Sequence, residues 1–266
     1  MHDFNHKRVV IVSVALAGEA YIPGRALHLG AACAHDFAKH GAHVIVLDPN
    51  HVALELLRDE IRSKGGSIDV MTVDIHDRDA LQRAANEIEE KWSSVHALVN
   101  AHLETEVGTI ATSDEQFWIR GVQMNLLSPV FAAQAFLNAL KASGQAAIVN
   151  LGSIDGMQGN PRLPAYSVAK GGIIPLTHLM ANEFAEFGIR VNCVARGMYI
   201  ERGEAVSPKF EPLIQQTPLA RPAYADEVAN AVRYLSSEQA SYISGVVLPV
   251  DGGRTCITPG TRWMSS

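Results

Sequence analysis

Tyr166 and Lys170 lie four residues apart in the segment Tyr166-Ser-Val-Ala-Lys170, and Ser153 lies thirteen residues upstream. Residues four apart on a helix face the same side, so a helix here would bring the ammonium beside the phenol. A nearby positive charge favours the phenolate form of a tyrosine, and a serine hydroxyl can hold a substrate oxygen beside it. The three residues predict a general acid/base device for an alcohol or a carbonyl. Tyr-x-x-x-Lys alone also occurs by chance on surface helices.

Ser153 follows a short apolar run, residues 146–151, whose length and composition predict a buried strand. Gly156 and Gly159 mark the loop after this strand, and Pro164 suits the first turn of the next helix. Ser153 is therefore expected at the carboxyl end of a strand, where open parallel sheets place their ligands.

Strand and helix patterns alternate along the chain. The predicted strands are 8–14, 43–48, 67–73, 97–101, 146–151, 190–194 and 246–250, and the predicted helices are 27–40, 53–64, 78–92, 114–142 (as one or two), 164–187 and 226–236. Repeated β-α units imply a parallel sheet with helices on both faces. We therefore predict a single-domain, doubly wound α/β fold of the Rossmann type over residues 1–266.

Further segments extend the pattern around Ser153, Tyr166 and Lys170 along the chain. They are Met124-Asn125-Leu-Leu-Ser-Pro, Val191-Asn-Cys-Val-Ala-Arg-Gly197, Ser241-Tyr-Ile-Ser-Gly245 and Val250-Asp-Gly-Gly253. With them, the chain resembles the short-chain dehydrogenase/reductase family over about residues 7–254. The resemblance implies that Tyr166 acts as acid/base and that Ser153 orients the substrate oxygen. It also implies that Lys170 supports the phenolate and binds the nicotinamide ribose, and that Asn125 holds a water.

The phosphate-binding turn departs from the family's pattern. Counted back from Gly41-Ala42, the family's Thr-Gly-x-x-x-Gly-x-Gly maps onto Pro23, Gly24, His28 and Gly30. The first strand ends near Ser13, so about ten residues, 14–23, are added to the turn. Either Ser13, Gly18 and Gly30 form a rebuilt loop around the pyrophosphate at a helix amino terminus, or the decorated loop binds nothing.

Two other cofactor segments also differ. The family's Asn-Asn-Ala-Gly reads Asn100-Ala-His-Leu103, and its Pro-Gly pair near the nicotinamide reads Arg196-Gly197. The resemblance implies that Asn100 and Gly197 still lie beside the cofactor. Leu103 then replaces a glycine close to the ribose, and Glu201 replaces a threonine.

Asp48 closes the second predicted strand, where a carboxylate can accept hydrogen bonds from both ribose hydroxyls of adenosine. It would repel a 2′-phosphate, and Pro49-Asn50 adds no arginine, so the sequence favours NAD over NADP. Alternatively, Asp48 only caps the next turn. Asp74 and Ile75 resemble the family's adenine-contacting pair, although Asp74 is also a candidate helix cap.

Composition argues against several functional classes. A hydrophobic content of 47% is ordinary for a globular protein with a large core. The net charge of −6 disfavours a nucleic-acid or anionic-membrane surface. The longest apolar stretch, residues 9–18, is about half of a membrane span. Three cysteines without paired spacing favour a reducing, cytoplasmic location. Eleven histidines show no metal-ligand spacing, so we expect no metal.

The sequence leaves two functions open: an NAD-dependent oxidoreductase for a secondary alcohol and its ketone, or a non-catalytic subunit that pairs with and stabilises an active relative. Apolar residues around much of the predicted helices at 114–142 and 164–187 predict a two-fold symmetric tetramer of like or unlike chains. By the resemblance, residues 198–217 form a substrate lid and residues 254–266 a tail. Arg162 and Arg196 are candidate contacts to a carboxylate or to the phosphate of a thioester carrier, or surface residues.

Overall fold

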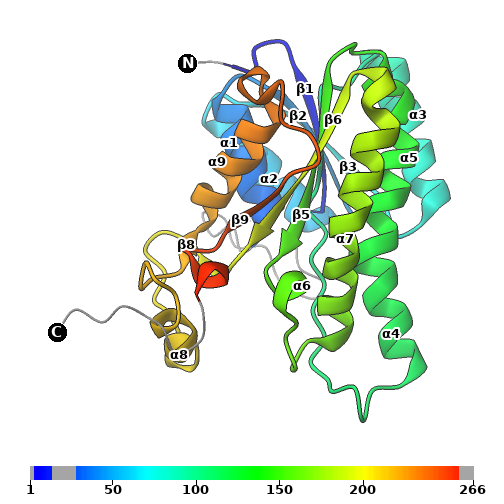
Figure 1. Ribbon diagram of the computed structural model, residues 1–266. Coiled ribbons are helices and arrows are strands. Elements are labelled where there is room, and N and C mark those ends of the chain that lie inside the picture. Colours follow the sequence, from blue (N-terminus) through cyan, green and yellow to red (C-terminus); the bar gives the residue numbers. More distant parts are fainter. Residues whose placement is uncertain (1–2, 14–27, 258–266) are drawn as a thin grey trace.

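Seven parallel strands form the central sheet of the computed structural model, which describes residues 3–13 and 28–257. They are β1 (Arg8–Val12), β2 (His43–Asp48), β3 (Ser67–Thr72), β4 (Ala97–Asn100), β5 (Ala146–Ser153), β6 (Ile189–Arg196) and β9 (Val247–Val250). The strands pair in the order β3-β2-β1-β4-β5-β6-β9 (Figure 1). The chain winds outward from β1 to β3 and then crosses to β4, so the predicted doubly wound fold is confirmed.

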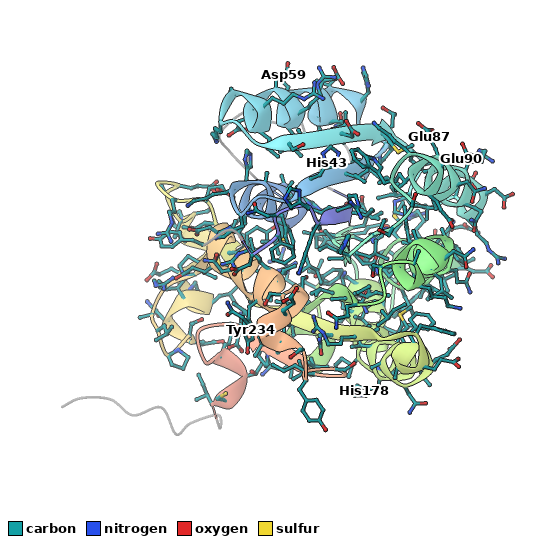
Figure 2. The ribbon with its side chains drawn as sticks, turned by 90° about the horizontal axis from the view of Figure 1, so that it is seen from above. His43, Asp59, Glu87, Glu90, His178 and Tyr234 are labelled. Atoms are coloured by element: carbon teal, nitrogen blue, oxygen red, sulfur yellow. The ribbon has the colours of Figure 1, made fainter. Side chains whose placement is uncertain are left out.

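Two helix layers cover the sheet. The helices are α1 (Leu29–Lys39), α2 (His51–Ser63), α3 (Arg78–Trp92), α4 (Glu115–Val122), α5 (Ser128–Lys141), α6 (Asp155–Gln158), α7 (Pro164–Glu183), α8 (Glu211–Gln215) and α9 (Ala225–Ser236). Buried residues of α1, α2 and α9 belong to one apolar core, and those of α3, α5 and α7 belong to another. Figure 2 shows Asp59, Glu87 and Glu90 on the outer faces of these layers, as amphipathic helices require.

The segment predicted as one long helix or two contains two helices. A π-helical turn, Gln123–Leu127, separates α4 from α5, and Asn125 lies in it, fully buried. Such single turns within α-helices occur frequently at functional sites. The turn redirects Asn125 toward the carboxyl end of β4.

Strands at the centre of the sheet end differently from the prediction. β1 ends at Val12 instead of continuing to residue 14, because Ser13 adopts a left-handed φ of 77°. β5 and β6 both extend past their predicted ends, so that Ser153 pairs with Arg196. A Cβ on Gly152 would lie 2.6 Å from Cys193 Sγ, so glycine at this position permits the extended pairing.

A smaller parallel pair lies outside the main sheet. It joins β7 (Tyr199–Ile200) to β8 (Ala223–Tyr224) and fixes both ends of the segment that contains α8. Among the described residues, no helix combines the length and the apolar character needed to cross a membrane.

Candidate active site

Ser153, Arg196 and Tyr166 meet at the carboxyl ends of β5 and β6. Ser153 is the register partner of Arg196 across the two strands. The Arg196 guanidinium donates from Nη2 to the Tyr166 hydroxyl oxygen at 2.8 Å. A guanidinium has only donors, so the phenol oxygen must be the acceptor and its own proton remains available for another oxygen.

Tyr166 and Lys170 lie one turn apart on α7, as their spacing predicts. The Lys170 ammonium is 5.9 Å from the centre of the Tyr166 ring. Its Nζ donates to the carbonyl oxygens of His102 at 2.6 Å and Leu151 at 2.9 Å. An ammonium has three donors, so one N–H of Lys170 is not used by these two bonds.

Close packing of two helices holds Lys170 in place. In Figure 1 the short helix α6 lies beside the start of α7. A Cβ on Gly156 would lie 2.5 Å from the Lys170 carbonyl carbon, so only glycine allows α6 to approach α7 this closely.

Burial, followed by the positive charge of Arg196, lowers the pKa of Lys170 to about 7. Near neutral pH a substantial fraction of Lys170 is therefore uncharged. Arg196 donates directly to the phenol oxygen, so it is the permanent positive charge nearest to Tyr166 in this arrangement. This contact is absent from the sequence prediction, which assigned the role of phenolate partner to Lys170.

Asn125 fixes the segment that follows β4. Its Oδ1 accepts from the Glu104 amide at 3.1 Å, and its Nδ2 donates to the carbonyl oxygens of Glu104 at 2.9 Å and Gly121 at 3.1 Å. Lys170 holds the same segment through the His102 carbonyl. Asn125 and Lys170 are thus linked through residues 102–104, as partners in one polar network.

The amino terminus of α1 is capped by a side chain. Nδ1 of His28 accepts from the Gly30 amide at 3.1 Å, so Nε2 carries the ring proton and faces Ser13 Oγ at 3.4 Å. Burial, with smaller effects of Lys170 and Arg196, lowers the pKa of His28 to about 3, so this ring is neutral. Gly24 and the inserted residues 14–23 lie outside the described residues.

Gly30 is required by packing between α1 and β1. A Cβ at this position would fall on the Ser13 carbonyl oxygen and would also lie 3.2 Å from Ala101 Cβ. Gly197 is similarly confined, because its Cβ would lie 2.9 Å from Asp251 Cα at the end of β9. Packing within the protein therefore requires glycine at both positions, independently of any ligand.

The remaining candidate residues lie around the carboxyl ends of β1 to β4. Asp48 is buried and its Oδ1 accepts from the Asn50 amide at 2.8 Å, so it does hold the turn into α2. The suggestion that Asp74 caps a helix is wrong, because Asp77 accepts from the first amides of α3. The exposed Asp74 accepts from the His76 amide instead, whereas the adjacent Ile75 is buried.

This edge of the sheet holds buried polar atoms that suit a dinucleotide. Asn100 Oδ1 is buried and has no hydrogen-bond partner among the described residues, and the buried His102 ring lies near it on the same segment. Buried polar atoms are rarely left unsatisfied, and a bound ligand can satisfy them. Asp48 adds an acceptor at the end of β2, and Lys170 adds an unused donor. The residues present therefore fit a nicotinamide dinucleotide. No group of three metal-ligating side chains occurs in residues 3–13 and 28–257.

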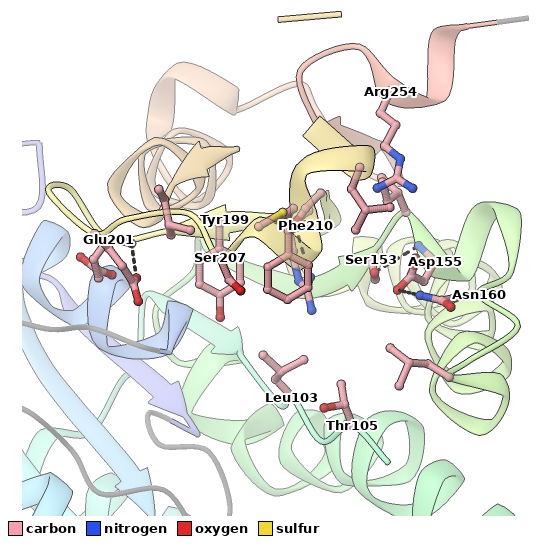
Figure 3. A pocket seen from close by; sticks show the side chains of 18 of the residues that line it. Leu103, Thr105, Ser153, Asp155, Asn160, Tyr199, Glu201, Ser207, Phe210 and Arg254 are labelled. Carbon is pink, nitrogen blue, oxygen red and sulfur yellow. Dashed lines mark hydrogen bonds between the residues drawn. The ribbon is translucent and has the colours of Figure 1, made fainter. Parts of the chain in front are cut away.

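A cavity of about 450 Å³ opens at the carboxyl ends of β5 and β6 (Figure 3). Ser153 and Arg196 line it together with Tyr199, Phe210 and Arg254. At another part of the wall, burial and then the nearby Glu204 raise the pKa of Glu201 to about 7. The sequence analysis placed Tyr199 and Phe210 in the predicted lid at residues 198–217 without singling them out, and it placed Arg254 in the tail. No motif identifies the three side chains, and only the fold brings them to the cavity.

Comparisons with known proteins agree with this fold and site. The family model described as enoyl-(acyl carrier protein) reductase matches residues 25–255. The chain is 31% identical to a 3-oxoacyl-(acyl-carrier-protein) reductase, FabG, of Thermotoga maritima, covering 87% of this chain and 95% of that protein. It is 32% identical to the cis-4-hydroxycyclohexanecarboxylate dehydrogenase of Sinomonas cyclohexanicum, in an alignment that covers 90% of this chain and 96% of that protein.

A solved short-chain dehydrogenase/reductase from Burkholderia xenovorans is similar in structure, with a TM-score of 0.86 and 25% identity over 96% of this chain and 99% of that one. The chain therefore belongs to the short-chain dehydrogenase/reductase family of oxidoreductases.

Proposed function

We propose that the protein is an NAD-dependent oxidoreductase that interconverts a secondary alcohol and a ketone. The observation that carries this proposal is that Arg196 joins the Tyr166 hydroxyl to Ser153, which lines a cavity at the carboxyl edge of the sheet. The Lys170 ammonium lies 5.9 Å from the centre of the same Tyr166 ring. Catalytic groups of family members need this proximity, because proton transfer requires hydrogen-bond reach.

Each residue has a distinct role in the proposed reaction. Ser153 Oγ holds the substrate oxygen, and the Tyr166 hydroxyl gives a proton to it during reduction or receives one during oxidation. Arg196 stabilises the negative charge that develops on the phenol oxygen, since it already donates to this atom. A bound nicotinamide supplies the hydride chemistry. In its ammonium form Lys170 has one N–H left to hold the ribose, and Asn125 keeps the segment at residues 102–104 in place.

Titration of the purified protein with NADH, followed by nucleotide fluorescence, tests the proposal. Saturable binding, together with turnover of secondary alcohols in the presence of NAD, is expected. Absence of any saturable response would favour a non-catalytic subunit.

One observation specifically favours the non-catalytic alternative. The His28 ring occupies the Gly30 amide at the start of α1, and a helix amino terminus is where family members bind the pyrophosphate. A chain that no longer bound the dinucleotide would be free to cap this helix permanently. Such a subunit would act by pairing with an active relative.

Replacement of Asp48 by Ala is expected to weaken NAD binding by about 1–3 kcal/mol. It is also expected to reduce the preference of the protein for NAD over NADP. The carboxylate would otherwise accept from the ribose hydroxyls and repel a 2′-phosphate. Dissociation constants for both nucleotides check this result. Because Asp48 also holds the Asn50 amide, Asp48→Asn is the matched control that keeps an acceptor but removes the charge. Tighter binding of NADP than NAD by the unmutated protein would contradict the assignment.

We also propose that the protein forms a two-fold symmetric tetramer, of identical chains or with a related chain. Large apolar side chains remain exposed on α4 and α7, namely Ile119, Val168 and Leu179. Apolar surface of this kind is commonly covered by a partner. Light scattering at micromolar concentration is expected to give a mass near four chains, and a monomer would contradict the proposal.

A further inference from the structure

Two arginine side chains reach the cavity, and neither forms an ion pair with a carboxylate of residues 3–13 and 28–257. Arg196 donates to the Tyr166 hydroxyl and to the Gly197 carbonyl at 3.3 Å, which uses two of its five N–H groups. For Arg254, the described residues offer neither an ion pair nor a side-chain hydrogen bond. Guanidinium groups at a cavity wall are strong donors to a planar anion.

The carboxylates nearest in sequence to Arg254 and Ser153 have other partners. Asp251 accepts from the Gly253 amide at 2.9 Å and from both the amide and the hydroxyl of Thr255 at 2.7 Å. Asp155 accepts from Asn160 Nδ2 at 3.3 Å, and its charge acts on the Arg196 guanidinium without a direct ion pair. In the described part of the chain, neither carboxylate forms a direct ion pair with a guanidinium of the cavity.

The two guanidinium groups lie on the side of the cavity that contains the reacting groups. Arg196 is paired in register with Ser153 and bonded to Tyr166. Figure 3 shows Arg254 on the same side as Ser153 and Asp155, whereas Glu201 lies toward the opposite end. A substrate oxygen held by Ser153 would thus bring the rest of a small molecule within reach of both cations.

Arg162, the other candidate from the sequence, is exposed and does not line the cavity.

We propose that the cavity takes a substrate that carries a carboxylate in addition to the reacting alcohol or ketone, with Arg254 and the unused N–H groups of Arg196 as its contacts. The reaction itself rests on the function proposed above, whereas binding of the acid does not require turnover. One relative is, by its name, a dehydrogenase of a hydroxycyclohexane carboxylate, which supplies a suitable probe.

The test compares cis-4-hydroxycyclohexanecarboxylate with its methyl ester, which has the same ring and hydroxyl but no charge. Calorimetry measures the affinity of each for the full chain, with and without NADH. The acid is expected to bind at least ~10-fold more tightly than the ester, because hydrogen bonds to charged groups are the stronger ones. Arg254→Gln is expected to remove that difference, and Arg162→Gln, an exposed matched control, is expected to preserve it.

The outcomes separate this inference from the proposed function. Preferential binding of the acid that depends on Arg254 supports the inference, even if NADH does not bind and the proposed oxidoreductase function fails. Equal binding of acid and ester, or binding of neither, overturns the inference, even if NADH binds. Phenyl phosphate is the third probe. If it binds more tightly than the acid, the anion is a phosphate and the carboxylate assignment is overturned.

Discussion

Tyr166→Phe is expected to reduce turnover by ~10²–10⁴-fold, because the phenol supplies the proton transfer and the remaining ring keeps the packing. The cofactor dissociation constant is expected to stay nearly unchanged. The substitution also removes the acceptor of Arg196 Nη2, so a cost of about 1–3 kcal/mol in the free energy of unfolding is expected. Steady-state kinetics and chemical denaturation measure the two effects separately.

Tyr234→Phe is the matched control, since this tyrosine lies on α9, is 41% exposed, and does not line the cavity. It is expected to leave both turnover and stability nearly unchanged. A Tyr166→Phe variant that retains more than about a hundredth of the wild-type turnover would exclude Tyr166 as the general acid/base.

Much of the fold follows from local sequence signals. β2 and α3 have the predicted bounds, because a short apolar run and an amphipathic period are complete within each segment. Asp77, which the sequence analysis did not select, caps α3. Asp74, which the sequence analysis gave as a candidate cap, accepts from the His76 amide instead. Both residues precede the helix, and the backbone path decides which of them reaches the first amides.

Tertiary contacts decide the features that the sequence did not reveal. The π-helical turn brings Asn125 to the Glu104 backbone, a contact between residues 21 positions apart. The extension of β6 places Arg196 opposite Ser153, so the residue that replaces the family's proline becomes a partner of the phenol. Periodicity and motif spacing carry no information about such contacts. They identified Ser153, Tyr166 and Lys170 as site residues, but they did not reveal the charged Arg196 guanidinium beside the phenol.

His28 illustrates how a change of motif alters the physical argument. The family's glycine at this position leaves the helix amino terminus open, whereas the imidazole accepts from the Gly30 amide. Because its pKa is lowered to about 3, the ring can act as a neutral cap at every pH at which the protein would be assayed. From the sequence alone, His28 indicated only the loss of a glycine.

Gly30→Ala is expected to lower the free energy of unfolding by about 3 kcal/mol, since overpacking against a backbone atom cannot be relieved by a side-chain rotation. The added Cβ would fall on the Ser13 carbonyl oxygen, so α1 must move away from β1 or the sheet must distort. The sequence interpretation gave a different reason, namely contact between the Gly30 backbone and the pyrophosphate. Chemical denaturation of the parent protein and of Gly30→Ala, each with and without NADH, distinguishes these two reasons.

Gly65→Ala is the control for backbone conformation. Gly65 has a φ of 78° but no atom within 4 Å of its added Cβ, so a cost of about 1–2 kcal/mol from the left-handed conformation alone is expected. If Gly30→Ala is no more destabilising than Gly65→Ala, the packing argument is wrong. If NADH stabilises the parent protein but not folded Gly30→Ala, the position also contributes to cofactor binding. If NADH stabilises neither protein, packing is the only role of Gly30, and the non-catalytic subunit becomes the better account of the chain.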